Sequence, residues 1–202
     1  MVFHSVSWRT STLLAITLLF SRNVFARKAT GKSATRYTFD FVYLQPCSTI
    51  PEAALKYINY TREMSSDGST SISGVGDLAR PAQRLIELLG VAHRCRDAVS
   101  ANTCEYFTKY VHNGDACGFI NSPLMPWASL MSKFEPPFKC PVQAGRYLLS
   151  NGTIDVDGIA RMFGVSPNND VWKFTVSIKD EKRAPFMCLD SAVRIVKYAS
   201  RG

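Results

Sequence analysis

The sequence has few of the residues on which catalysis and metal binding depend. It contains three histidines among 202 residues, and only 20% of its residues are charged. Its six cysteines show no Cys-x-x-Cys spacing, which zinc sites commonly use. The glycine-rich dinucleotide motif, the P-loop and His-Glu-x-x-His are also missing. These absences argue against a metalloprotein or a cofactor-dependent enzyme, so we predict no metal, no cofactor and no enzymatic activity.

No apolar stretch of the sequence is long enough to cross a membrane. The longest, residues 13–20, is LLAITLLF, whereas a transmembrane helix needs about 20 residues. Arg9 before this stretch and Val24-Phe25-Ala26 after it complete the pattern of a cleavable secretory signal. An uncleaved membrane anchor is the alternative. We therefore predict a signal peptide over residues 1–26 and a product that is secreted and extracellular, or lysosomal.

The formal charge of +8 is concentrated near the N-terminus. Two basic residues lie in the predicted signal, and residues 27–36 hold four more and no acidic one. The remaining chain carries 18 basic and 16 acidic residues, a balance that argues against nucleic acid as a partner. We predict a basic N-terminal arm over residues 27–36 and one domain over residues 37–202. A solvated arm is the preferred interpretation, and contact with an acidic membrane surface is the alternative.

The six cysteines all follow the predicted signal peptide. An even number of cysteines in a secreted chain is typical of disulfides, and the sequence alone leaves their pairing open. Asn59-Tyr60-Thr61 and Asn151-Gly152-Thr153 match the acceptor motif for N-glycosylation. Both motifs agree with a secreted product, and we predict glycosylation at Asn59 and Asn151.

Alternating apolar residues predict an all-β fold. Tyr37, Phe39, Phe41 and Tyr43 alternate with polar residues over residues 36–44, as period 2 requires. Residues 170–179 repeat the pattern, and further strands are expected at 57–63, 69–75, 145–149, 152–158 and 186–198. About seven short strands joined by turns predict an immunoglobulin-like two-sheet antiparallel β-sandwich.

The middle of the chain is less regular. Residues 82–89 have a helical composition without a clean period, so helix and strand both remain open. Residues 105–111 predict one or two helical turns, and residues 124–134 an apolar, partly helical central loop that must cover something. His93 and His112 are expected in exposed loops. Asp155 and Asp157 are expected on one strand face, where solvated carboxylates are the preferred interpretation and paired acids in catalysis the alternative.

One segment resembles a known family. The run Cys140-Pro141-Val142-Gln143-Ala144-Gly145-Arg146-Tyr147 is similar to the Cys-Pro-x-x-x-Gly-x-Tyr segment of the ML lipid-recognition superfamily, in its ganglioside-activator-like branch. The strand at 170–179, the charged turn after it and Cys188 in the last strand follow in the order found in that family. Residues 102–107 and the segment around Trp127 before Pro136-Pro137 resemble small secreted arthropod relatives. The match is loose between residues 51 and 90.

The resemblance implies a β-sandwich with an apolar cavity between its sheets. It also implies the disulfides Cys47–Cys188, Cys95–Cys104 and Cys117–Cys140. We accordingly expect a secreted, non-catalytic protein that holds an acyl chain, a glycolipid or a sterol and presents it to an enzyme or a receptor, with transient contact to a membrane surface or a receptor. The alternative is an extracellular interaction protein, an immune or chemosensory receptor ligand or co-receptor with little lipid binding. A lipid hydrolase is a third class, for which His93 and His112 offer few catalytic groups.

The residues expected around the lipid form two walls and a lip. Core packing is the alternative role for each of them. The walls are Phe39, Phe41, Tyr43, Trp172, Phe174, Val176 and Ile178, and the lip is Leu124, Met125, Trp127, Met131 and Phe134.

Overall fold

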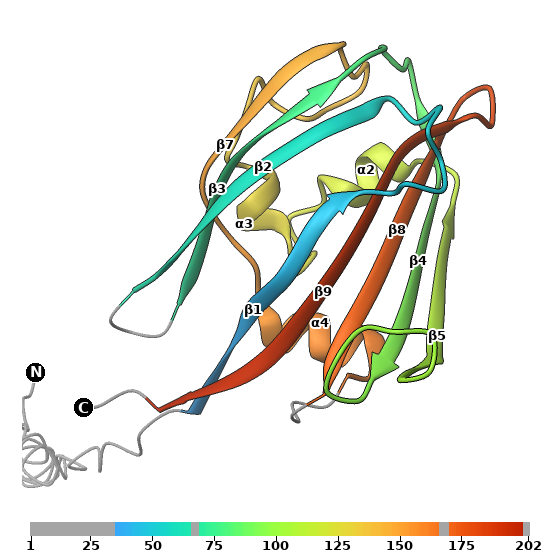
Figure 1. Ribbon diagram of the computed structural model, residues 1–202. Coiled ribbons are helices and arrows are strands. Elements are labelled where there is room, and N and C mark those ends of the chain that lie inside the picture. Colours follow the sequence, from blue (N-terminus) through green and yellow to red (C-terminus); the bar gives the residue numbers. More distant parts are fainter. Residues whose placement is uncertain (1–34, 66–68, 166–169, 200–202) are drawn as a thin grey trace, which may run out of the picture. The chain divides into compact units, whose positions relative to one another are not determined.

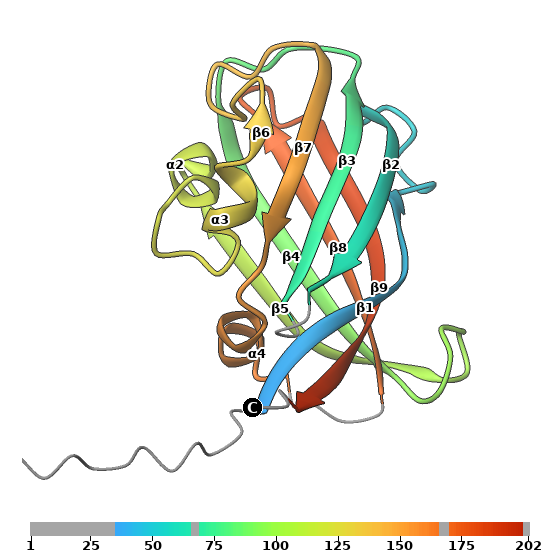
Figure 2. The same ribbon diagram turned by 90° about the vertical axis from the view of Figure 1, so that its left-hand side faces the viewer.

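Two antiparallel sheets face each other in the computed structural model, which describes residues 35–65, 69–165 and 170–199 (Figures 1 and 2). Sheet A has the order β1-β9-β8-β4-β5. Its strands are β1 (Thr35–Pro46), β9 (Pro185–Ala199), β8 (Val171–Asp180), β4 (Leu85–Cys95) and β5 (Cys104–Asn113). Sheet B has the order β2-β3-β7-β6. Its strands are β2 (Leu55–Met64), β3 (Thr70–Leu78), β7 (Gly145–Thr153) and β6 (Phe134–Glu135). The predicted two-sheet sandwich is confirmed.

Short helices cover the open parts of the sandwich. Helices α2 (Ala116–Ile120) and α3 (Ala128–Met131) lie against the side beside β6 and β7, and α4 (Val156–Phe163) lies at one end (Figure 2). The expected helical central loop therefore exists as α2 and α3. None of the helices in the described part of the chain is long and apolar enough to cross a membrane. The predicted signal peptide, and the arm up to residue 34, lie outside the described residues.

Residues 105–111 form part of a strand, so the predicted helical turns are wrong. They belong to β5, which pairs with β4 from Glu87↔Asn113 to Cys95↔Cys104. Tyr, Phe, Thr and Val dominate the segment and favour extended backbone. Residues 85–89, left open between helix and strand, belong to β4, which pairs with β5 on one side and β8 on the other. Backbone hydrogen bonds to strands on both sides therefore determine the conformation of this segment, despite its helical composition.

Residues 156–163 form helix α4, so the strand predicted over 152–158 is wrong beyond Thr153, where β7 ends. The Asp155 carboxylate accepts a hydrogen bond from the Gly158 backbone N–H at 2.9 Å and caps the helix. Gly164 ends it with a φ of 66°, in the left-handed region that glycine adopts without strain. The alternation of Ile154 and Val156 predicts a strand, whereas Asp155 and Gly164 are the signals for the start and the end of a helix. Asp155 and Asp157 therefore lie at the start of a helix and not on a strand face.

Three disulfides brace the sandwich in the pairing that the resemblance implies. Cys47–Cys188 joins the end of β1 to β9, with a sequence separation of 141 between the two cysteines. Cys95–Cys104 joins the paired ends of β4 and β5. Cys117–Cys140 ties α2 to the segment before β7. All six cysteines are accordingly bonded.

One end of the sandwich is closed around Asp180, whose side chain is 1% exposed. Its carboxylate accepts a hydrogen bond from Arg80 at 2.5 Å and others from the backbone N–H groups of Lys182 and Ala184 at 2.9 and 3.0 Å. Burial alone would raise the pKa of Asp180, but these donors outweigh it and the pKa lies below its ordinary value. The carboxylate thus holds the β8–β9 turn against the segment that follows β3.

Candidate functional site

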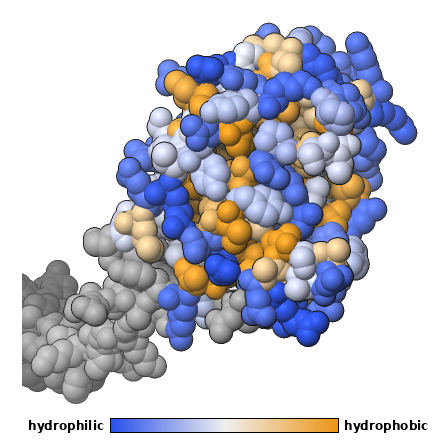
Figure 3. All heavy atoms as spheres, in the orientation of Figure 1, coloured by the Kyte–Doolittle hydropathy of each residue, from blue (hydrophilic) through white to orange (hydrophobic). Residues whose placement is uncertain are grey.

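An apolar cavity of about 370 Å³ lies between the two sheets. Its size is in the range of small-molecule sites, about 300–1,000 Å³. Sheet A contributes side chains from β1, β4, β5, β8 and β9, sheet B from β2, β3, β6 and β7, and the three helices close the remaining sides. Among the described residues, no Asp, Glu, Lys, Arg or His lines this cavity. On the face shown in Figure 3, hydrophobic residues are visible through the middle of the molecule between hydrophilic ones.

The cavity exists because some inward positions carry no side chain. Gly90 lies on β4 opposite Val176 of β8 and Tyr110 of β5. A Cβ at Gly90 would meet only the ring of Phe163, at 3.7 Å. The usual interdigitation of side chains between packed sheets is therefore interrupted at this point, and Phe174 and Val176 are only partly buried although they face inward.

Eight of the twelve predicted residues line this cavity. Five come from the predicted walls and three from the predicted lip. They are Phe39, Phe41, Phe174, Val176, Ile178, Trp127, Met131 and Phe134. The structure therefore brings together segments that lie more than 100 residues apart in the chain.

Tyr43 lies outside the cavity because β1 contains a bulge. The register with β9 shifts between Phe41, which pairs with Val193, and Tyr43, which pairs with Ala192. An extra residue on one strand reverses the side to which the following side chains point, so Leu44 lines the cavity instead. The Tyr43 hydroxyl donates to Asp190 at 3.4 Å. Burial together with the Asp190 charge raises the pKa of Tyr43 to about 12.

Three further predicted residues also lie outside the lining. Trp172 is 1% exposed and packs against Phe107, with the ring centroids 4.9 Å apart. It belongs to the cluster of buried side chains that includes Val156 and Val165 next to α4, and so has the core role. Leu124 is 87% exposed and Met125 is partly exposed, both in the turn between α2 and α3. The predicted lip is thus represented by α3 and β6 and not by this turn.

Trp127 of the lip is held by a hydrogen bond and an aromatic contact. The indole N–H of Trp127 donates to the backbone carbonyl of Ile120 at 2.9 Å. Phe119 lies edge-on to Trp127, with centroids 5.6 Å apart, and stacks on His112 at 4.3 Å. His112 and His93 therefore lie half-buried on β5 and β4 and not in the exposed loops expected for them. Neither histidine lines the cavity.

Several lining residues escaped the sequence prediction. On β2, Ile58 and Tyr60 alternate inward, and the Tyr60 ring contacts Phe41 edge-on with centroids 5.7 Å apart. Their alternation was a usable signal. Tyr110 and Leu88 had no such signal. Residues 105–111, which include Tyr110, predict helical turns, and the composition of residues 82–89 does not distinguish helix from strand. Gly90 could not be found from a pattern of apolar residues, since its contribution is the absence of a side chain.

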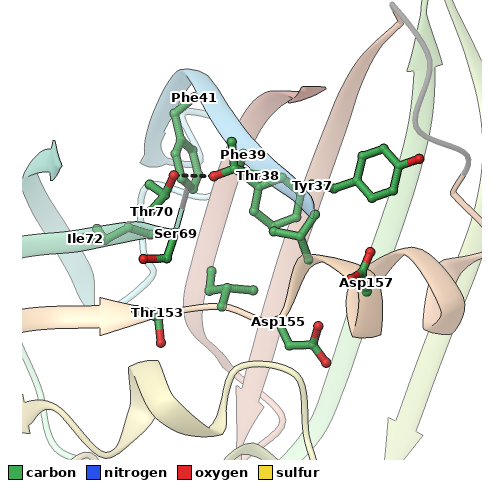
Figure 4. Close-up of a pocket in the computed structure, with 12 residues that line it drawn as sticks. Tyr37, Thr38, Phe39, Phe41, Ser69, Thr70, Ile72, Thr153, Asp155 and Asp157 are labelled. Atoms are coloured by element: carbon green, nitrogen blue, oxygen red, sulfur yellow. Dashed lines mark hydrogen bonds between the residues drawn. The ribbon is translucent and has the colours of Figure 1, made fainter. Parts of the chain in front are cut away.

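A second, smaller cavity of about 260 Å³ adjoins the first at the α4 end (Figure 4). Phe39, Phe41, Ile72 and Ile154 line both cavities, so the two are neighbours. The smaller one also has polar walls, formed by Thr38, Ser69, Thr70, Thr153, Asp155 and Asp157. An apolar cavity thus lies beside a smaller one with polar walls at the α4 end.

No family model and no curated protein matches the chain. Among solved structures, it is similar to chicken MD-1 in a complex with lipid IVa, with 16% sequence identity and a TM-score of 0.38. The similarity covers 81% of this chain and 98% of that one.

Proposed function

We propose that the protein is an extracellular, non-catalytic carrier that holds the apolar part of a lipid between its two sheets. The observation that carries this proposal is the uncharged cavity of about 370 Å³, to which both sheets contribute aromatic and aliphatic side chains. The three disulfides support an extracellular location, because disulfides form and persist in oxidising compartments. The exposed acceptor residues Asn59 and Asn151 are compatible with glycosylation there.

The size of the cavity favours one hydrocarbon chain over several. At about 30 Å³ for each non-hydrogen atom, as for a water molecule in the liquid, it holds on the order of a dozen atoms. Each methylene moved out of water contributes roughly 0.8 kcal/mol. A single acyl chain therefore binds well without polar contacts in the interior.

The direct test is lipid analysis of the secreted protein purified without detergent. We expect one lipid with a single long chain per molecule of protein, released by solvent extraction and visible as a mass increment in native mass spectrometry. Protein that is secreted empty and takes up no dodecanol in titration calorimetry would contradict the carrier. That outcome would favour the alternative, an interaction protein without a ligand in its core.

A cavity-filling variant tests the position of the lipid. Gly90→Leu adds a side chain to the cavity wall, where its Cβ would lie at van der Waals distance from the Phe163 ring, so we expect at least a tenfold loss of dodecanol affinity with an unchanged or higher melting temperature. Val91→Leu is the matched control, because Val91 is the next residue on β4 and does not line the cavity. Equal affinities for the two variants would place the ligand elsewhere.

A further inference from the structure

Few polar side chains of the described residues line the apolar cavity, and all of them are uncharged. Those that carry a nitrogen or an oxygen atom are Asn59, Tyr60, Tyr110, Trp127, Tyr147 and Ser191. An ion that moves from water into apolar surroundings without a partner of opposite charge loses a large part of its hydration free energy. A ligand group that enters this cavity is therefore uncharged, and it can hydrogen-bond to whichever of these side chains has capacity left.

Three of these side chains already donate their hydrogen bonds within the protein. The Trp127 indole N–H donates to a backbone carbonyl of α2. The Tyr147 hydroxyl donates to the Gln143 carbonyl at 3.0 Å and accepts the Gln143 backbone N–H at 3.2 Å. The Ser191 hydroxyl donates to the backbone carbonyl of Phe174 at 3.4 Å. These three groups have no hydrogen left to donate to a ligand.

Two of the remaining side chains have free hydroxyl groups. Asn59 is not one of them, because it lies on β2 between Ile58 and Tyr60, which line the cavity, so its exposed side chain points to the other face of the sheet. The hydroxyls of Tyr60 and Tyr110 make no hydrogen bond with any other described residue. A hydroxyl can donate one hydrogen bond and accept two, so both retain their full capacity for a ligand.

Tyr110 is held more firmly than Tyr60. Its ring stacks on Phe119 of α2, with centroids 5.6 Å apart, and lies edge-on to Phe163 of α4 at 6.4 Å. The Tyr60 ring, on an edge strand of sheet B, has Phe41 as its single aromatic contact among the described residues. A ring held by two neighbours presents its hydroxyl in a fixed position, and a binding group that is fixed beforehand loses less entropy when the ligand binds.

We infer that the ligand is a neutral single-chain lipid whose uncharged oxygen, in a hydroxyl, carbonyl or ester group, hydrogen-bonds to the Tyr110 hydroxyl inside the cavity. This inference rests on the proposed function and names the class of its ligand. It excludes lipids that would bring a carboxylate, a phosphate or an ammonium group into the cavity. The apolar walls bind the chain, and Tyr110 distinguishes an oxygenated chain from a plain hydrocarbon.

The first test compares dodecanol with two charged probes of the same chain length, laurate and dodecylamine. Partition between buffer with and without protein, quantified by gas chromatography at neutral pH, measures each dissociation constant below the critical micelle concentration. We expect dodecanol to bind at least tenfold more tightly than either ion, since both ions would lose hydration without gaining a partner. Laurate or dodecylamine bound as tightly as dodecanol would overturn the inference while leaving the carrier intact. A protein that binds none of the three would instead refute the proposed function.

The variant Tyr110→Phe assigns the hydrogen bond to this residue. It removes only a hydroxyl that has no partner in the described part of the protein, so we expect an unchanged melting temperature. The affinity for dodecanol should fall about fivefold, as the loss of one net hydrogen bond produces, and the affinity for dodecane should stay the same. Tyr57→Phe is the matched control, because Tyr57 is exposed on β2 and does not line the cavity. Unchanged dodecanol binding by Tyr110→Phe, or an equal loss of dodecane affinity, would overturn the inference.

Discussion

Thr38 on β1 and Thr70 on β3 share a hydrogen bond that crosses from sheet A to sheet B beside the smaller cavity. Thr38 is 3% exposed, although it lies next to a cavity. Close by, Arg62 of β2 pairs with Asp40 of β1. Polar contacts thus join the two sheets at this edge, together with the ring contact between Phe41 and Tyr60.

Replacing Thr38 by valine tests the contact between the sheets. The two side chains have the same shape, so only the hydroxyl is lost, and we expect the free energy of unfolding to fall by about 1 kcal/mol. Urea unfolding measures the change, with Thr49→Val as the control at an exposed turn position. An unchanged midpoint in Thr38→Val would show that solvent replaces the bond at no cost.

Replacing Asp180 by asparagine tests the closed end of the sandwich. Arg80 and two backbone N–H groups lose a charged acceptor, for which we expect a loss of about 2–3 kcal/mol in the free energy of unfolding. Since the pKa of Asp180 is lowered by folding, its contribution is fully present above the ordinary value of 3.8 and is lost as the pH falls through the folded value. Unfolding measured from neutral pH down to about pH 2 should therefore show a shallower acid limb in the variant. An acid limb identical to that of the wild type would contradict the assignment; Glu63→Gln serves as an exposed control.

Substitutions of Met131 and Leu124 compare a residue that lines the cavity with a residue on the surface. Met131 lines the cavity, whereas Leu124, in the turn before α3, is 87% exposed. We expect Met131→Ser to weaken dodecanol binding about tenfold, because it exposes part of the chain to a polar group, and Leu124→Ser to have no effect. Binding and melting temperature are measured together. A Met131 variant that loses thermal stability but binds normally would have a core role only.

The disulfides differ in the length of chain that they close. Replacing Cys47 and Cys188 by serine opens a separation of 141 residues, and replacing Cys95 and Cys104 one of 9. In the chain-entropy model the losses are about 5 and about 3 kcal/mol. Calorimetric unfolding of the two double variants checks the order. If the short bridge proves the more important, strain or structure in the unfolded chain outweighs loop entropy.

The strands that contact the cavity through one regular face could be predicted from the sequence. Phe174, Val176 and Ile178 alternate without interruption on β8 and all line the cavity. The same pattern on β1 predicted Tyr43 wrongly, because a bulge leaves no mark in an alternation of aromatic residues. Trp172 fits the alternation but lies beyond the cavity, in packed core. An alternation with period 2 predicts which face of the sheet a side chain is on, but not whether that part of the face borders the cavity or the core.

The remaining errors arose where two local signals competed. Residues 152–158 alternate like a strand, yet the Asp155 cap and Gly164 define a helix, and the cap lies in the polar wall of the smaller cavity. On β5, composition near Glu105 suggested a helix, but pairing with β4 determined the outcome. The cavity as a whole could not be predicted from patterns, because its volume depends on Gly90 and on helices that cover the sides.

The two ends of the described chain lie side by side, since Thr35 of β1 pairs with Ala199 of β9. A force applied to these ends therefore separates the strands one residue pair at a time, as a zipper opens. The separation proceeds as far as Pro46↔Leu189 and stops at the covalent link between Cys47 and Cys188. Tension beyond that point is borne by the disulfide and does not reach the strands behind it. Because Phe39 and Phe41 leave with β1, mechanical load opens the cavity while most of the sandwich stays folded.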